Sequence, residues 1–88
     1  MKVLVIYRPR SEHGRTVEEF VNEFQRRYPD ARLEIMDIDS RDGSATASLY
    51  DIMQHPAILI LQNDGYLHKV WMGESLPLMD EVFAYAQA

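Results

Sequence analysis

Apolar residues without alternation open the chain and predict a strand that is buried on both faces. The segment from Lys2 to Tyr7 is rich in β-branched and aromatic residues, and Arg8-Pro9 ends it. From Thr16 the apolar residues recur at spacings of three and four, which predicts one stripe of a helix. The stripe consists of Val17, Phe20, Val21, Phe24 and Tyr28. The capping-box spacing of Thr16 and Glu19 favours a regular start at Thr16, after a looser first turn from Ser11.

The pattern then changes to a weaker strand and a short helix. Residues 32–38 alternate apolar and charged side chains, which predicts a strand less buried than the first and placed at an edge of the sheet. After a turn at residues 40–43, a short helix is expected to end before Pro56. Its buried face is expected to consist of Ala45, Leu49, Ile52 and Met53.

The last third of the chain predicts a hairpin and a closing helix. Two strand-like runs, residues 57–62 and 66–72, flank Asn63-Asp64-Gly65, and an Asp-Gly pair in such a place is a strong hairpin signal. After Gly73, Ser75 is expected to cap a helix with Pro77 in its first turn. The buried stripe of this helix is expected to be Met79, Val82, Phe83 and Ala86.

The element order is therefore β-α-β-α-β-β-α, which predicts an α/β fold. A β-α-β unit requires parallel strands joined by a right-handed crossover, and the later hairpin adds antiparallel strands. The expected result is a mixed four-stranded sheet in the order 2-1-3-4 with helices on both faces. A length of 88 residues allows one domain, covering residues 1–88.

Composition excludes several classes of function. The chain has no cysteine, so it cannot supply disulfides, thiolate nucleophiles or cysteine-ligated metals. A net charge of −5 argues against nucleic acid and anionic membranes as partners. Uninterrupted apolar runs reach only five residues, too short for a bilayer span or a signal-peptide core, so a cytoplasmic location is expected.

Charge is unevenly distributed along the chain. Residues 1–32 hold seven basic and five acidic residues, whereas residues 33–88 hold two and nine. This polarity favours an interaction through opposite patches, with a partner or as weak self-association.

From Tyr50 onward the sequence resembles the thioredoxin and glutaredoxin superfamily. Thioredoxins carry a tyrosine six residues before a proline, then an apolar strand, an Asn-Gly type turn, a second strand and a glycine. This chain reads Tyr50-Asp51-Ile52-Met53-Gln54-His55-Pro56, followed by the strand at 57–61, Asn63-Asp64-Gly65 and Gly73. The resemblance implies a minimal thioredoxin-like fold over essentially the whole chain, with Pro56 preceded by a cis peptide bond.

The chain departs from that family where the family keeps its Cys-x-x-Cys motif. Aligning the helix stripe places Ser11 and Gly14 at the two cysteine positions, whereas counting from Tyr7 places Glu12 and Arg15 there. Neither alternative supplies a thiol, so the resemblance implies a redox-inactive member. A serine–histidine hydrolase using Ser11 and His13 lacks a recognisable carboxylate to orient the imidazole, and no catalytic residue is predicted.

Two binding functions remain open. By the resemblance, an extended protein or peptide partner would bind beside the proline, since strand addition requires backbone groups and no cysteine. That surface would comprise Arg10, Ser11, Glu12, His13, His55, Pro56, Met72 and Gly73. It could equally be a vestige of a redox ancestor. The alternative is a phosphate or glutathione-like anion bound at the first helix N-terminus by Arg8, Arg10 and Arg15.

The residues near the first helix do not predict a metal site. His13, His55 and Glu12 are residue types that bind zinc or copper, but nothing in their spacing requires a metal. We therefore expect no metal and no cofactor.

Overall fold

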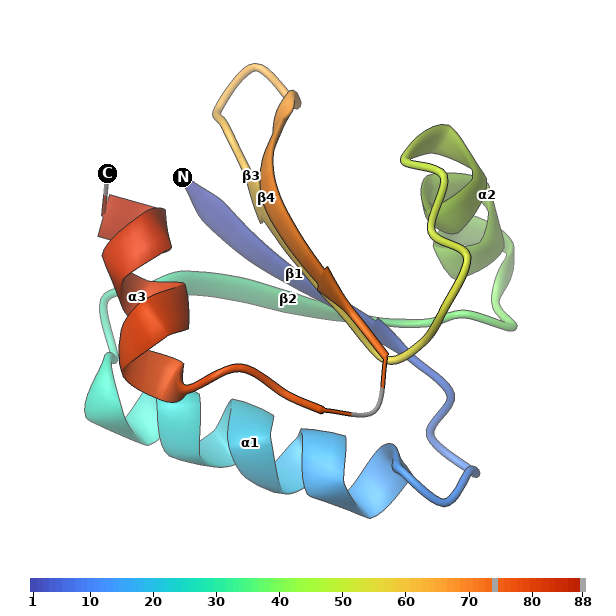
Figure 1. Ribbon diagram of the computed structural model, residues 1–88, viewed down its shortest axis with the longest axis horizontal. Helices are drawn as coiled ribbons and strands as arrows, with labels where there is room; N and C mark the ends of the chain where they lie inside the picture. Colours follow the sequence, from blue (N-terminus) through green and yellow to red (C-terminus); the bar gives the residue numbers. More distant parts are fainter. Residues whose placement is uncertain (74, 88) are drawn as a thin grey trace.

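The computed structural model describes residues 1–73 and 75–87 of the chain, and it confirms the predicted order of elements (Figure 1). The elements are β1 (Lys2–Tyr7), α1 (Gly14–Arg27), β2 (Arg32–Asp37), α2 (Arg41–Leu49), β3 (Ala57–Leu61), β4 (Leu67–Met72) and α3 (Met79–Gln87).

The four strands form one mixed sheet in the order β2-β1-β3-β4, as predicted. Strand β1 is parallel to β2 and antiparallel to β3, and β4 is antiparallel to β3. Val5 lies in register with Ile35 on one side and with Ile58 on the other. Gly65 closes the hairpin with a φ of 91°, in the left-handed region that glycine adopts without steric cost. The long apolar strands β1 and β3 therefore occupy the centre, where both faces are covered.

Helices α1 and α3 cover one face of the sheet, and α2 covers the other (Figure 1). The core on the α1 side consists of Val3, Val5, Tyr7, Val17, Phe20, Val21, Phe24, Ile58, Ile60 and Val82. The core on the α2 side consists of Leu4, Ile6, Ala47, Ala57, Leu59 and Leu61. Alternate residues of β1 and β3 thus feed opposite cores, which explains their unbroken hydrophobicity.

Helix α1 begins at Gly14, earlier than the capping-box spacing predicts. His13 occupies the N-cap position and its carbonyl oxygen accepts a hydrogen bond from the N–H of Val17 at 3.0 Å. The predicted start at Thr16 is wrong because a turn closed by Ser11 already directs the chain into the helix, with the N–H of Gly14 donating to the carbonyl of Ser11. The predicted stripe is buried from Val17 to Phe24.

The buried face of α2 differs from the prediction. Gly43 and Ala47 face the sheet, whereas Leu49 is 73% exposed and Met53 is 85% exposed. A side chain at residue 43 would bring its Cβ to 2.0 Å from the carbonyl oxygen of Asp37. Close contact with the end of β2 therefore selects the small residues for the inner face. Of the predicted face only Ile52, beyond the helix end, packs against the core, and Ala45 is exposed.

Helix α3 begins at Met79, so the predicted cap at Ser75 is wrong. The carbonyl oxygen of Leu78 accepts from the N–H groups of Glu81 and Val82 at 3.1 Å and starts the helix there. Val82 is fully buried. The rest of the predicted stripe, Met79, Phe83 and Ala86, is partly buried against the same core.

Candidate functional site

The loop before α1 and the residues before β3 meet at one end of the sheet. The imidazole rings of His13 and His55 lie 5.4 Å apart, in an edge-to-face arrangement. The peptide bond between His55 and Pro56 is cis. The N–H of Gly73 donates to the carbonyl oxygen of Pro56 at 3.0 Å, and Met72 lies in register with Ala57. Pro56 itself is fully buried, and we call the surface that His13, His55, Met72 and Gly73 form around it the cradle.

Arg8 ties the two histidines of the cradle to each other. Its backbone N–H donates to Nε2 of His13, and its guanidinium Nη1 donates to Nε2 of His55, both at 3.3 Å. A backbone N–H and a guanidinium can only donate, so both Nε2 atoms accept.

The guanidinium of Arg8 also forms a bidentate ion pair with Asp39, a residue that is not among those predicted for the site. Nε donates to Oδ2 at 2.9 Å and Nη2 donates to Oδ1 at 3.1 Å. The hydrogen bond from Arg8 holds the pKa of the Asp39 carboxyl below its ordinary value, and Asp39 raises the pKa of Arg8. Topology supplies a signal for this pair, because β1 and β2 are parallel and their carboxyl ends meet at the same edge.

The three arginines proposed for anion binding do not converge. Arg8 is neutralised by Asp39, and Arg15 lies 3.3 Å from Glu19 on the outer surface of α1. Arg10 is exposed and makes no hydrogen bond or ion pair with the residues that the structure describes. Of these three arginines, Arg10 is the one that has no ion pair within residues 1–73 and 75–87.

Other residues predicted for the site have separate roles. The hydroxyl of Ser11 donates to the carbonyl oxygen of Arg8 at 2.6 Å and so closes the turn, rather than bonding to His13. Glu12 is exposed. Within residues 1–73 and 75–87, no group of three histidine, aspartate or glutamate side chains could hold a metal ion, so Glu12 does not complete a site with His13 and His55.

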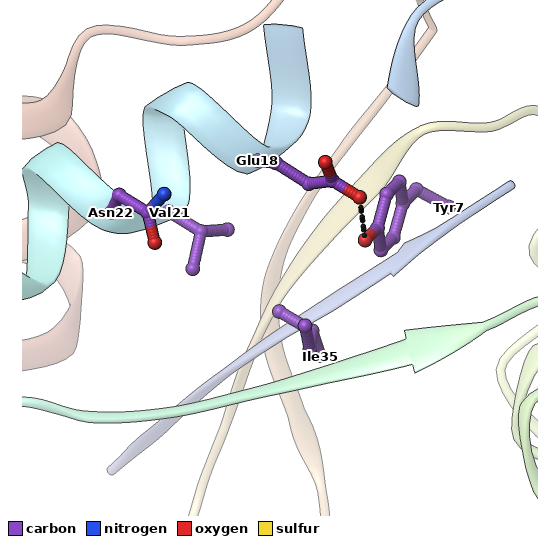
Figure 2. Close-up of a pocket in the computed structure, with 5 residues that line it drawn as sticks. All are labelled: Tyr7, Glu18, Val21, Asn22 and Ile35. Carbon is purple, nitrogen blue, oxygen red and sulfur yellow. Dashed lines mark hydrogen bonds between the residues drawn. The ribbon is translucent and has the colours of Figure 1, made fainter. Parts of the chain in front are cut away.

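A hollow lies between α1 and the edge strand β2 (Figure 2). Its volume is about 270 Å³, and it is lined by Tyr7, Glu18, Val21, Asn22 and Ile35. The hydroxyl of Tyr7 donates to Oε2 of Glu18 at 2.8 Å. Burial, followed by this hydrogen bond, raises the pKa of the Tyr7 phenol to about 12. The sequence pattern alone predicts Tyr7 only as the end of a buried strand.

The folded state favours the neutral form of the Tyr7 phenol. The buried, hydrogen-bonded phenol should therefore stabilise the protein fully below pH 10, and this stabilisation should be lost as the pH rises to 12. We expect the free energy of unfolding of the wild type relative to Tyr7→Phe to fall by about 2–3 kcal/mol across this range. Urea unfolding of both proteins from pH 9 to 12 measures the difference. A constant difference, or a phenol that ionises near pH 10 in a spectrophotometric titration, would contradict the expectation.

No family model and no curated protein matches this chain by sequence. Solved structures do match over nearly its full length. Thioredoxin O2 from Arabidopsis thaliana in the oxidized state is similar with a TM-score of 0.71 and 15% identity, covering 98% of this chain and 71% of that chain. Thioredoxin 1 from Thermosipho africanus matches with a TM-score of 0.71 and 13% identity, covering 99% of this chain and 91% of that chain.

Mitochondrial thioredoxin 3 from Saccharomyces cerevisiae gives the same TM-score of 0.71 at 18% identity, covering 97% of this chain and 74% of that chain. The chain has a thioredoxin-like fold. Because the sequence identities are below one fifth, these similarities establish the fold and do not establish an activity. This thioredoxin-like chain contains no cysteine, so it offers no thiol for thiol–disulfide exchange.

No helix within the described part of this thioredoxin-like chain is long and apolar enough to cross a membrane. A cytoplasmic location stays a prediction from the sequence.

Proposed function

We propose that this thioredoxin-like domain is a non-catalytic binding module that holds an extended segment of a protein partner in the cradle. The observation that carries the proposal is the contact between His13 and His55, which makes one surface from the loop before α1 and the turn before β3. A segment lying across this surface would touch both parts of the chain at once.

The backbone of His55 supports this mode of binding. Neither its N–H nor its carbonyl oxygen makes a hydrogen bond to the residues that the structure describes. An extended peptide can pair with both groups, as in strand addition, and side-chain contacts then supply specificity. Met72 is 42% exposed beside this backbone and offers an apolar, adaptable contact to one partner side chain.

Anion binding at the α1 N-terminus is the weaker candidate. The ion pairs of Arg8 with Asp39 and of Arg15 with Glu19 would have to be given up before either arginine could bind phosphate or glutathione. We propose no catalytic role, because the reactive groups near the cradle are engaged in fixing the loop: Ser11 bonds to backbone, and Arg8 donates to both imidazoles.

Peptides selected from a random display library provide the test. We expect selected peptides to shift the backbone amide signals of His13, His55 and Gly73, and His55→Ala with Met72→Ser to weaken binding by about tenfold or more, since truncation of central contacts costs at least this much. His68→Ala, an exposed histidine of β4, is the matched control and should change the affinity by less than about twofold.

Methylation of the peptide backbone separates strand addition from other contacts. A selected peptide that is N-methylated at the residue opposite His55 should lose binding, because the missing N–H can no longer pair with the His55 carbonyl. Unchanged binding of the methylated peptide, or displacement of the peptide by phosphate or glutathione at residues 8–15, would refute the proposal.

A further inference from the structure

We propose that the hollow between α1 and β2 binds the terminal ammonium group of a primary alkylamine, with its methylene chain against Ile35. This site is separate from the cradle and uses residues that the proposed function does not. The ammonium can come from a small free amine or from a lysine side chain of a partner.

The hollow contains a carboxylate, that of Glu18, which one hydrogen bond orients. Figure 2 shows Glu18 pointing from α1 toward Tyr7, with the phenol hydroxyl donating to Oε2. Tyr7 is only 4% exposed, and its protonated phenol donates to Glu18, an exposed side chain of α1. Oε1 of Glu18 has no hydrogen-bond partner among the described residues. One acceptor of an oriented carboxylate is therefore available to a ligand.

A second carboxylate, that of Asp37, lies close to the same phenol. Asp37 lies in register with Tyr7 on β2, and both Asp37 and Glu18 raise the pKa of the phenol through their negative charge. No basic side chain is among the described residues that line the hollow. Two carboxylates close to the phenol, with no basic side chain among these lining residues, favour a cation. The amide of Asn22, also on the lining, can contribute an additional acceptor.

Val21 and Ile35 form an apolar wall of the hollow. Ile35 lies in register with Val5, which belongs to the core on the α1 side, and it is 48% exposed. Figure 2 shows Ile35 pointing from β2 toward the helix, opposite Val21. Methylene groups next to an ammonium pack well against such a wall while the charged head reaches the carboxylate.

Size limits the ligand further. Pockets for drug-sized ligands typically measure about 300–1,000 Å³, and this hollow measures about 270 Å³. It suits a short amine or one side chain rather than a large cofactor. Strand β2 is an edge strand, so the hollow is reachable both from solvent and from a partner segment beside the sheet.

Titration of the full chain with n-butylammonium chloride, at constant ionic strength, tests the site by NMR. We expect saturable shifts of the Ile35 δ-methyl, the Asn22 side-chain amide and the Tyr7 ring signals. n-Butanol, which lacks the charge, should give much weaker shifts. Equal shifts with butanol, or shifts that do not saturate, would overturn the proposal.

Glu18→Gln and Glu19→Gln form a matched pair for the carboxylate. Both remove one charge from the same helix, but Glu19 faces outward beside Arg15. Glu18→Gln should weaken amine binding by about tenfold or more, as expected for loss of a charge-assisted hydrogen bond, and Glu19→Gln by less than about twofold. Equal effects would show non-specific charge attraction and overturn the site. Should Glu18→Gln fail to fold, Ile35→Ser tests the apolar wall and should weaken binding by about threefold or more.

The source of the amine is distinguished by a second ligand. Nα-acetyl-lysine N-methylamide carries the same ammonium on a peptide backbone. Tighter binding of this compound than of butylammonium supports a partner lysine as the ligand, and equal or weaker binding supports a free amine. Acetylation of its Nε atom should abolish binding in either case, and persistent binding of the acetylated compound would refute recognition of the ammonium.

Discussion

Replacing Phe24 with alanine is expected to lower the free energy of unfolding by about 3–5 kcal/mol, the usual cost of emptying a large aromatic site in a core. The side chain is fully buried, and its ring lies between those of Phe20 and Tyr28, at centroid distances of 6.2 and 5.2 Å. Tyr28 in turn stacks on Phe83 of α3 at 3.8 Å. The substitution therefore weakens the attachment of both helices on this face of the sheet.

Urea unfolding followed by far-ultraviolet circular dichroism measures the loss. Gln25→Ala, an exposed neighbour on the same helix, is the control and should change stability by less than about 0.5 kcal/mol. Small domains have total stabilities of only about 5–15 kcal/mol, so the Phe24 variant should be partly unfolded without denaturant if the wild type lies at the lower end. A loss below about 1 kcal/mol would contradict the described packing.

Gly14→Ala is expected to destabilise the protein by about 1–3 kcal/mol, although the same change normally stabilises a helix by about 1 kcal/mol. A Cβ atom at this residue would lie 2.1 Å from the carbonyl oxygen of Pro9, far closer than atoms can approach. Either the loop or the first turn of α1 must move. Since His13 immediately precedes Gly14, we also expect the contact between His13 and His55 to be disturbed.

Two measurements check the Gly14 prediction. Chemical unfolding shows whether the substitution lowers or raises the free energy of unfolding. The ring signals of His55 report whether the cradle has changed. Thr16→Ala lies in the same turn at an exposed residue and should leave both nearly unchanged. A Gly14→Ala protein that is more stable than the wild type, with unshifted His55 signals, would show that the loop does not approach the helix as described.

Most of the fold could be predicted from local patterns. The unbroken apolar strands β1 and β3, the stripe of α1 and the turn closed by Gly65 each specify their element directly, and chirality fixes the parallel crossover from β1 to β2. The face of α2 could not be predicted in this way. Its small residues are buried because the helix approaches the backbone of Asp37, a contact that hydrophobicity does not encode.

The contacts at the candidate sites also differ in whether the sequence predicts them. The meeting of His13 with His55–Pro56 follows from the topology and was expected from the resemblance. The pairing of Arg8 with Asp39 depends on side-chain rotamers at the ends of two strands, and surface charges choose partners that a linear sequence does not specify. The bond from Tyr7 to Glu18 likewise requires knowing how far α1 extends over the sheet.

Tyr7 and Arg8 are consecutive residues, yet Tyr7 lines the hollow beside β2 while Arg8 fastens the histidines of the cradle. A single peptide unit thus separates the two surfaces. For protein engineering they form one design unit, because an insertion or a register change at this junction would displace both surfaces. Point substitutions at Ile35 or Met72 instead change one surface and leave the backbone of residues 7 and 8 in place.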